Sequence, residues 1–485
     1  MRKLSEILHG IPVIKIAGNY DVPVYKLYID SRLVTKNSIF VALRGTQVDG
    51  HNFINEVIKK GAKAIICEKI PSEIKCDITY VQVDNTALQV GHIADSYYNH
   101  PSSKLKVVGI TGTNGKTTIA TLLYNLFRRM GSRSGLISTV VNYVDSKSYY
   151  STHTTPDAIQ INKLLNKMVE ANCKYCFMEV SSHAIVQHRI NGINFASGVF
   201  TNITHDHLDY HKTFNEYLAA KKKFFDDLPK TSFVLINSDD KNGNVITQNT
   251  KAAISTYSLK TPADFNALIK ESHINGMLLK INNTEMWTRL IGKFNASNIL
   301  AIYSTAILLG ANKEKIMPEL SDLNAVDGRF EYFTSPNGYT VIVDYAHTPD
   351  ALLNVLQTIK QLVKNNGQII TVVGSGGNRD KTKRPIMAKV SAELSNKVIL
   401  TSDNPRNELP ENIIAGMKQG LDAELSKKVL TIIDRREAIR TACQFATKDD
   451  MILIAGKGHE TYQEVNGVKT HFDDREIVKK ILLDG

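Results

Sequence analysis

The sequence has little of what marks secreted, membrane-spanning or disordered proteins. Only five of its 485 residues are cysteine, and their spacing does not form a disulfide framework. No apolar run approaches the roughly 18 residues that a membrane span needs, and Glu6, His9 and Lys15 interrupt the apolar amino terminus. We found no internal repeat and no low-complexity linker. With 42% hydrophobic and 22% charged residues, the composition predicts a globular, soluble cytoplasmic protein.

Two further features, a CxxC pair and a positive net charge, do not by themselves identify a function. Cys173 and Cys176 form a CxxC pair, but Cys176 lies within the strand-like "YCFMEV" and no second pair follows. We therefore expect buried thiols here and no zinc or redox site. The net charge of +11 favours an anionic partner, which nucleic acid or a small phosphorylated substrate would satisfy equally.

The length and the order of elements predict an α/β protein of about three domains. The first hundred residues alternate short strands with helices and end at the break "HPSSK". From Val107 the strands alternate with longer helices, which predicts a parallel sheet covered on both faces. After "AVDGRFEYF" a new series begins, in which each strand ends in a polar or glycine-rich loop. Ligands of open α/β sheets bind at such carboxyl ends.

One of these loops has the composition of a phosphate-binding loop. The strand "LKVVGIT" leads into "GTNGKTT", residues 112–118, and an amphipathic helix follows. Glycines let backbone N–H groups face phosphate oxygens, Lys116 can reach the terminal phosphates, and Thr117 can place its hydroxyl on Mg²⁺. The Walker pattern requires a glycine where this chain has Ile110. The loop still predicts ATP binding.

The stretch "GTNGKTT" resembles the ATP loop of the Mur ligase family, the ATP-dependent amide-forming enzymes of peptidoglycan synthesis together with folylpolyglutamate synthetase. The motifs "MEVSSHAIVQHR", "TNITHDHLDYH", "AAKKKFFDDL", "GKFNASN", "DGRFE" and "VDYAHTPDAL" continue the resemblance in the family's order along nearly the whole chain. For ATP the resemblance implies binding by Gly112, Thr113, Asn114, Gly115, Lys116, Thr117, Thr118, Asn295, Arg329, Asp344 and His347.

The same motifs contain candidate metal ligands. Glu179 follows one apolar strand, and Asn202, His207 and Asp209 follow another, so a carboxylate and an imidazole are expected near a phosphoryl group. The resemblance implies Mg²⁺ binding by Glu179 and His207. It also implies that Lys221 carries CO₂ as a carbamate, which binds a second Mg²⁺. Lys222 and Lys223 are interpreted as a solvated basic face.

The amino-terminal motifs indicate a nucleotide-sugar substrate. The segment "IDSRLVTKNSIFVALRGTQVDGHNFI" resembles the first-domain signature of the family member that adds the third residue of the peptide. The resemblance implies that the UDP-sugar and its peptide are held by Ser31, Thr46, Gln47, Val48, Thr154, Thr155, Ser181, Gln187 and Arg189.

The last third of the chain resembles a pocket for meso-diaminopimelate. The motifs "GSGGNRDKTKRP", "SDNPRNELP" and "AGKGHETYQ" imply binding by Arg379, Asp403, Asn404, Pro405, Arg406, Gly456 and Glu460. Arg406 would bind the distal carboxylate and Glu460 the distal ammonium group. Lysine-adding relatives replace this arginine, commonly with a neutral residue. From its position alone, Arg406 could also be an exposed turn residue after Pro405.

The resemblance implies three domains: residues 1–103 binding the UDP-sugar, residues 104–327 as a P-loop ATPase-like domain with a parallel sheet, and residues 328–485 as a Rossmann-like domain binding the incoming amino acid. The expected activity is ATP-dependent addition of meso-diaminopimelate to UDP-N-acetylmuramoyl-L-alanyl-D-glutamate through an acyl phosphate. The catalytic residues would be Lys116, Glu179, His207 and Lys221. Two Mg²⁺ ions and a monomer are expected, without nucleic acid or membrane.

Three alternatives remain at this point. The nearest is the lysine-adding enzyme of the same family, which differs at Arg406. A folate-polyglutamylating ligase shares the phosphate loop but leaves "DSR" and "TQVDG" unexplained. The third is a P-loop ATPase that binds nucleic acid, which the charge of +11 permits.

Overall fold

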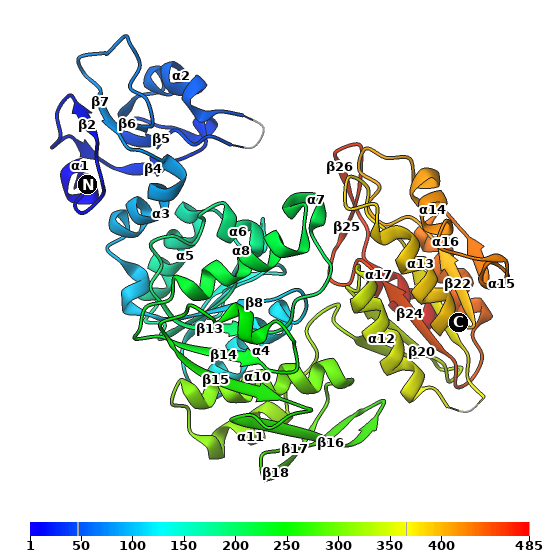
Figure 1. The fold of residues 1–485 in the computed structure, drawn as a ribbon. Coiled ribbons are helices and arrows are strands. Elements are labelled where there is room, and N and C mark those ends of the chain that lie inside the picture. The colour runs from blue at the N-terminus through cyan, green and yellow to red at the C-terminus, as the bar shows by residue number, and fades with distance from the viewer. Residues whose placement is uncertain (46–47, 365, 485) are drawn as a thin grey trace.

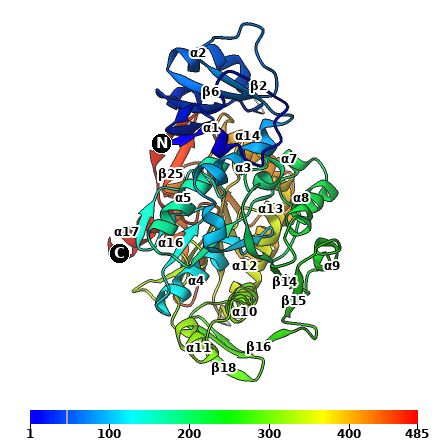
Figure 2. The ribbon, with the colours of Figure 1, turned by 90° about the vertical axis from the view of Figure 1, so that its left-hand side faces the viewer.

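The computed structural model describes residues 1–45, 48–364 and 366–484. Three sheets follow one another along the chain, each with its own helices. The amino-terminal unit (blue in Figure 1) lies at one end of the central unit, and both views place α11 (Lys313–Ser321) and β18 (Thr284–Thr288) at the other (Figures 1 and 2). The carboxyl-terminal unit (yellow to red) lies beside the central one.

The amino-terminal unit contains a five-stranded sheet in the order β2-β7-β6-β5-β4. All neighbours are parallel except β2 and β7. The strands are β2 (Lys15–Ala17), β4 (Lys26–Tyr28), β5 (Ser38–Val41), β6 (Ala62–Cys67) and β7 (Thr79–Gln82), and β1 (Arg2–Lys3) pairs separately with β3 (Pro23–Val24). The helices are α1 (Leu4–Ile7), α2 (Ile54–Lys59) and α3 (Thr86–Tyr97).

The central unit contains an eleven-stranded sheet in the order β11-β10-β9-β12-β8-β13-β14-β15-β16-β17-β18. The strands are β8 (Lys106–Thr111), β9 (Ser134–Ile137), β10 (Asn142–Val144), β11 (Lys147–Tyr149), β12 (Tyr175–Glu179), β13 (Phe195–Phe200), β14 (Phe233–Asn237), β15 (Ala253–Ser258), β16 (Phe265–His273), β17 (Gly276–Ile281) and β18. The stretch from β9 to β16 is parallel, as the βαβ pattern predicts. Antiparallel strands extend both edges, which the sequence analysis did not anticipate.

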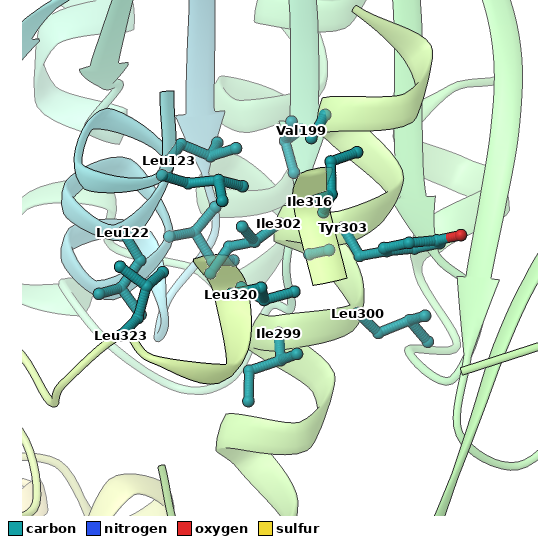
Figure 3. Packing of buried hydrophobic residues seen from close by; sticks show 14 of the residues in the cluster. Leu122, Leu123, Val199, Ile299, Leu300, Ile302, Tyr303, Ile316, Leu320 and Leu323 are labelled. Carbon is teal, nitrogen blue, oxygen red and sulfur yellow. The ribbon is translucent and has the colours of Figure 1, made fainter. Parts of the chain in front are cut away.

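Helices cover both faces of this sheet. They are α4 (Lys116–Arg129), α5 (Ala158–Glu170), α6 (Ser182–Val186), α7 (Leu208–His211), α8 (Phe214–Asp226), α9 (Gly243–Ile246), α10 (Lys293–Leu308) and α11. Figure 3 shows Leu122 and Leu123 of α4 packed near Ile299 and Ile302 of α10 and Leu320 of α11. A second core, under α5 and α8, fills the opposite face. Burial on both faces explains the apolar runs of the central strands.

The carboxyl-terminal unit contains a six-stranded sheet in the order β19-β20-β24-β21-β22-β23, in which only β19 is antiparallel. Its strands are β19 (Glu331–Thr334), β20 (Thr340–Asp344), β21 (Ile369–Val373), β22 (Lys397–Leu400), β23 (Val429–Thr431) and β24 (Met451–Ala455), and β25 (Tyr462–Val465) forms a hairpin with β26 (Val468–His471). The helices are α12 (Pro349–Leu362), α13 (Lys383–Leu394), α14 (Pro410–Lys418), α15 (Ala423–Ser426), α16 (Arg435–Phe445) and α17 (Asp474–Asp484).

The predicted α/β architecture with three units is confirmed. The domain boundaries at 103/104 and 327/328 stay predictions. Cys173 and Cys176 are buried free thiols, as expected. Within the described residues, no helix combines the length and the apolar character that a membrane crossing requires.

Candidate functional site

A cleft of about 1160 Å³ lies between the central and carboxyl-terminal units. The central unit lines it with the phosphate loop and with the loops that follow β12 and β13. The carboxyl-terminal unit contributes the loops that follow β20, β21, β22 and β24. The cleft therefore collects the carboxyl ends of parallel strands from two sheets, where the sequence predicted the chemistry to lie.

The phosphate loop joins β8 to α4 and depends on its two glycines. Gly112 has a φ of 150° and Gly115 a φ of 90°. A Cβ on Gly112 would lie 1.9 Å from the Thr201 hydroxyl oxygen, and one on Gly115 would lie 2.7 Å from the Asn298 side-chain oxygen. Only glycine suits both positions, because the conformation and the space each exclude a side chain.

Lys116 folds back over this loop. Its Nζ donates to the carbonyl oxygens of Gly112 at 3.0 Å and Thr113 at 2.8 Å. Burial lowers the pKa of Lys116, and Glu179 and Asp206 oppose that shift from a distance. Among the described residues, no carboxylate lies within ion-pair distance of the ammonium group. Lys116 is thus held at the loop without a counter-ion.

Glu179 and Thr117, both predicted metal ligands, are in direct contact. Glu179 ends β12 and is fully buried. Its carboxylate accepts hydrogen bonds from the Thr117 hydroxyl at 2.9 Å and from the Thr139 N–H at 2.7 Å. Arg329 crosses from the carboxyl-terminal unit and donates to the Thr117 oxygen at 3.2 Å. The two predicted oxygen ligands and a predicted ATP-binding arginine therefore meet at one point.

His207 lies on the neighbouring loop, directly before α7, with a left-handed φ of 56°. Its Nε2 lies 3.4 Å from an Asp206 carboxylate oxygen. Burial lowers the pKa of His207 to about 3 in spite of that carboxylate. The ring is therefore neutral at physiological pH and keeps a lone pair for a metal ion.

The donor set suits Mg²⁺. A carboxylate, a neutral imidazole and a hydroxyl line the same cleft. The described residues contain no group of three or more His, Cys, Asp or Glu side chains that would form a complete protein-built cage. Mg²⁺ commonly binds through one or two protein carboxylates and completes its shell with water and substrate phosphates.

Lys221 is buried beneath the phosphate loop, on α8. Its Nζ donates to the Gly112 carbonyl at 2.9 Å and lies 3.4 Å from the Thr111 hydroxyl. Burial, assisted by the nearby positive charge of Lys116, lowers the pKa of Lys221 well below its usual value. A neutral amine is the form that reacts with CO₂. Lys222 and Lys223 instead pair with Asp226 and Asp227, at 2.7 and 2.8 Å; only Lys223 is solvated as expected, because the Lys222 side chain is 15% exposed.

The remaining predicted ATP residues also line the cleft. Asn295 donates to the Ile291 carbonyl at 2.9 Å. Asp344 ends β20, accepts from two backbone N–H groups, and has a pKa that burial raises. Burial also lowers the pKa of His347 to about 4, and its Nδ1 lies 2.9 Å from the Tyr345 carbonyl oxygen.

The sequence analysis missed a second residue, besides Arg329, that joins the two units at the phosphate loop. Asp350 of α12 accepts a hydrogen bond from the Asn114 side chain at 3.0 Å and one from the Thr204 hydroxyl at 3.4 Å. Asp350 lies within the predicted motif "VDYAHTPDAL", but its contact with Asn114 spans 236 positions. A single sequence contains no signal for that pairing.

The predicted UDP-sugar residues fall into two groups. Thr154, Thr155, Ser181 and Arg189 line the cleft. Arg189 donates to the Thr155 carbonyl at 2.8 Å and to the Gln187 side chain at 2.6 Å, so the guanidinium is held in place.

The other group belongs to the amino-terminal unit. Ser31 begins a short 3₁₀ turn, and Val48 is 55% exposed. Neither of them lines the cleft. Thr46 and Gln47 lie outside the described residues. Their roles stay predictions.

The predicted amino-acid pocket is an interconnected polar cluster. The Asn404 side chain donates to Glu460 at 2.8 Å. Arg406, with a φ of 52°, donates to the Gly377 carbonyl at 2.8 Å and lies 3.6 Å from the Glu464 carboxylate. Arg379 is exposed at the rim of the cleft, and a Cβ on Gly456 would lie 2.7 Å from Asp403. Pro405 is buried beside them.

Lys457 organises this cluster and was also missed. It is fully buried, and its Nζ donates to the Asn404 side chain at 3.0 Å and to the Tyr462 carbonyl at 2.6 Å. Asp403 and Glu460 lie 3.6 and 3.5 Å from the same ammonium group. Its position between two glycines in "AGKGHE" is the one signal that could have identified it, because a lysine there has no helix or strand surface to cover.

Comparison with known proteins agrees with the motifs. Residues 110–306 match the Mur ligase middle domain, residues 328–458 the Mur ligase glutamate ligase domain, and residues 23–98 the Mur ligase family catalytic domain. The chain belongs to the Mur ligase family. The resemblance drawn from the sequence is thereby confirmed.

This Mur ligase has similar relatives over its full length. It is 57% identical to the UDP-N-acetylmuramoyl-L-alanyl-D-glutamate–2,6-diaminopimelate ligase of Bacteroides fragilis, across 99% of both chains. It is 40% identical to the protein of the same name in Clostridioides difficile, again across 99% of both. A solved structure of a ligase of that name matches with a TM-score of 0.69 and 32% identity, over 99% of each chain.

Proposed function

We propose that this Mur ligase joins meso-diaminopimelate to UDP-N-acetylmuramoyl-L-alanyl-D-glutamate, with ATP converted to ADP and phosphate, in peptidoglycan precursor synthesis. The observation that carries the proposal is one cleft in which a phosphate loop faces an acid–base cluster containing Arg406 and Glu460. The names of the relatives that match along the full length support the same substrates.

The first step is phosphoryl transfer. A carboxylate oxygen of the D-glutamyl residue attacks the γ-phosphorus, an O–P bond forms, and the bond to the β–γ bridging oxygen breaks, so that ADP leaves with the electron pair. Lys116, which has no counter-ion among the described residues, would bind the transferring phosphoryl group. Thr117, Glu179, His207 and, as a carbamate, Lys221 would hold two Mg²⁺ ions, whose charge stabilises that group.

The second step forms the amide. The amine of diaminopimelate attacks the acyl carbon, a C–N bond forms, the C–O bond to phosphate breaks, and the nitrogen loses a proton. Arg406 and Glu460 would hold the distal carboxylate and the distal ammonium group of the amino acid. Because the phosphate loop and this pair belong to different units, bringing the reactants together accounts for much of the rate.

The lysine-adding activity is the nearest alternative, and Arg406 argues against it. Lysine lacks the distal carboxylate that Arg406 would bind, so the guanidinium would keep only its 3.6 Å ion pair with Glu464. A nucleic-acid-dependent ATPase is less well supported, because the motifs and the relatives indicate a ligase.

The test is phosphate release by the purified full chain with ATP, Mg²⁺, the UDP-muramoyl-dipeptide and a panel of amino acids. We expect release to require all components and to be fastest with meso-diaminopimelate. Faster release with lysine would overturn the substrate assignment. Release stimulated by polynucleotide and indifferent to amino acid would overturn the ligase activity.

A further inference from the structure

The segment "KTKR" at the start of α13 contains a buried cation that the functions above do not use. Three basic residues occur within four positions: Lys381, Lys383 and Arg384. Glu408 is the acid that pairs with Arg384 and Lys381. It accepts from both terminal nitrogens of Arg384 at 3.0 Å and lies 3.5 Å from Lys381.

Lys383 takes no part in that network. It is only 8% exposed, and among the described residues its ammonium group has neither an ion pair nor a hydrogen bond. Its side chain is largely buried, but its ammonium group reaches the cleft, where its charge acts on Asp206 of the central unit, beside His207. A cation that lines a cleft without a hydrogen-bonded partner is available to an anionic ligand.

The position of Lys383 indicates where that anion would lie. Lys383 lines the same cleft as Lys116, Thr117 and His207, from the opposite unit. It is the first residue of α13, a twelve-residue helix, so the positive end of the helix dipole adds to its charge. Its charge is also felt at His347 across the cleft, where it contributes to the lowered pKa of that histidine.

The loop before α13 contacts the central unit. Asp380 lies 3.6 Å from the Nε2 of His205, on the loop that also presents His207. On its other side, the Asn378 N–H donates to Glu408 at 2.6 Å. The loop that precedes Lys383 therefore has contacts with the central unit on one side and with Glu408 on the other.

We propose that Lys383 binds the γ-phosphoryl group of ATP during transfer, as a second cation supplied by the carboxyl-terminal unit opposite Lys116. The proposal rests on the proposed ligase function. Two cations from two units would make transfer depend on the units being docked, because the phosphoryl group meets its full complement of charge only in the closed cleft.

The test compares Lys383→Met with Lys389→Met, a matched control on the same helix whose lysine is 57% exposed and 3.9 Å from Glu393. Affinities for ADP and for a non-hydrolysable ATP analogue are measured by calorimetry, without acceptor substrates. We expect Lys383→Met to weaken the ATP analogue about tenfold and ADP less than about twofold. The control should change neither. Equal weakening of both nucleotides, or of neither, would overturn the proposal.

Turnover and stability provide two further readouts. Phosphate release with all substrates should fall about 100-fold in kcat for Lys383→Met, with the KM for the amino acid within about threefold. Lys383→Arg should recover part of that loss, because it keeps the charge. The Tm of Lys383→Met should equal or exceed that of the wild type, since the ammonium group makes no hydrogen bond or ion pair on which the fold depends. A clearly lower Tm with normal kcat would show a structural role and contradict the proposal.

Nucleotide binding separates this proposal from the proposed function. If the amino-acid panel fails while Lys383→Met still distinguishes the ATP analogue from ADP, the substrate assignment is wrong and the role of Lys383 stands. If the panel succeeds and the discrimination is absent, only the role of Lys383 is wrong.

Discussion

The two sides of the cleft treat buried positive charge differently. On the central side, Lys116 and Lys221 donate to main-chain carbonyls and a hydroxyl, and no carboxylate of the described residues lies within 4 Å of them. In the amino-acid pocket of the carboxyl-terminal unit, which does not include Lys383, Lys457 lies between Asp403 and Glu460, at 3.6 and 3.5 Å. The first arrangement attracts an anion, and the second is already balanced. A phosphate group suits the former, and a zwitterionic amino acid suits the latter.

The largest effect is expected at Lys116. Lys116→Ala removes a cation that meets the charge developing on the phosphoryl group, so turnover should fall about 100-fold or more while the fold is retained. Steady-state phosphate release and circular dichroism measure the two properties. Near-normal turnover in a folded variant would mean that the uncompensated lysines do not mark the phosphate site.

Lys221 tests whether the second uncompensated lysine acts as a carbamate. Lys221→Ala should lose at least about tenfold in kcat, and added acetate or formate should restore part of it by supplying a carboxylate. Lys221→Arg should not be active, because a guanidinium stays positive and cannot take up CO₂. Full activity of Lys221→Ala would exclude the carbamate at this position.

Lys457 tests the amino-acid pocket, in which this lysine is paired with two carboxylates. Lys457→Met should raise the KM for diaminopimelate about tenfold and leave kcat within about threefold, because Asn404 and Glu460 lose the group that orients them. The KM for ATP should stay unchanged. A Lys457→Met protein in which ATP and amino-acid binding weaken together would show that the two sides are not independent.

The smallest effect is expected at Glu408, the acid that neutralises Arg384 and leaves Lys383 without a partner. The Arg384 guanidinium holds the pKa of Glu408 down at about 2. The pair therefore stabilises the fold fully above the carboxyl group's ordinary pKa of 4.5, and this stabilisation is lost as the pH falls toward 2. Glu408→Gln should lower the free energy of unfolding at pH 7 because the ion pair with Arg384 is lost. The decrease should be only about 1–2 kcal/mol, since the carboxylate is partly exposed.

Denaturant unfolding of wild type and Glu408→Gln between pH 7 and pH 3 checks this prediction. The difference between the two proteins should be constant down to about pH 5 and then narrow. A difference that grows as the pH falls would contradict the prediction, because a carboxylate with a lowered pKa loses its stabilising effect at low pH.

The functional residues could be predicted from the sequence where they lie together in one segment. The phosphate loop, the strand that delivers Glu179 and the "DNPR" turn each combine glycine, strand or turn signals with their functional residues. The antiparallel hairpin of β16 and β17 was also predictable, because the Asn275–Gly276 pair at its turn is a hairpin signal that went unused.

Contacts between units could not be predicted. The contacts of Asn114 with Asp350 and of Thr117 with Arg329 join segments whose proximity depends on the packing of whole units. Whether a lysine is paired is likewise a property of the folded chain. Lys381 and Lys383 look alike in the sequence, yet one lies 3.5 Å from an acid and the other faces the cleft.

The central claim is that Arg406 and Glu460 recognise the incoming amino acid, and that they act separately from the residues that bind the phosphates. The most direct measurement is kcat/KM for meso-diaminopimelate and for lysine in the wild type and in Arg406→Ala. We predict that the wild type prefers diaminopimelate by roughly 10⁴-fold, since lysine lacks the carboxylate that Arg406 would bind. Arg406→Ala should lose most of that preference and keep the KM for ATP. A wild type that prefers lysine, or an Arg406→Ala protein with an unchanged ratio, would contradict the account.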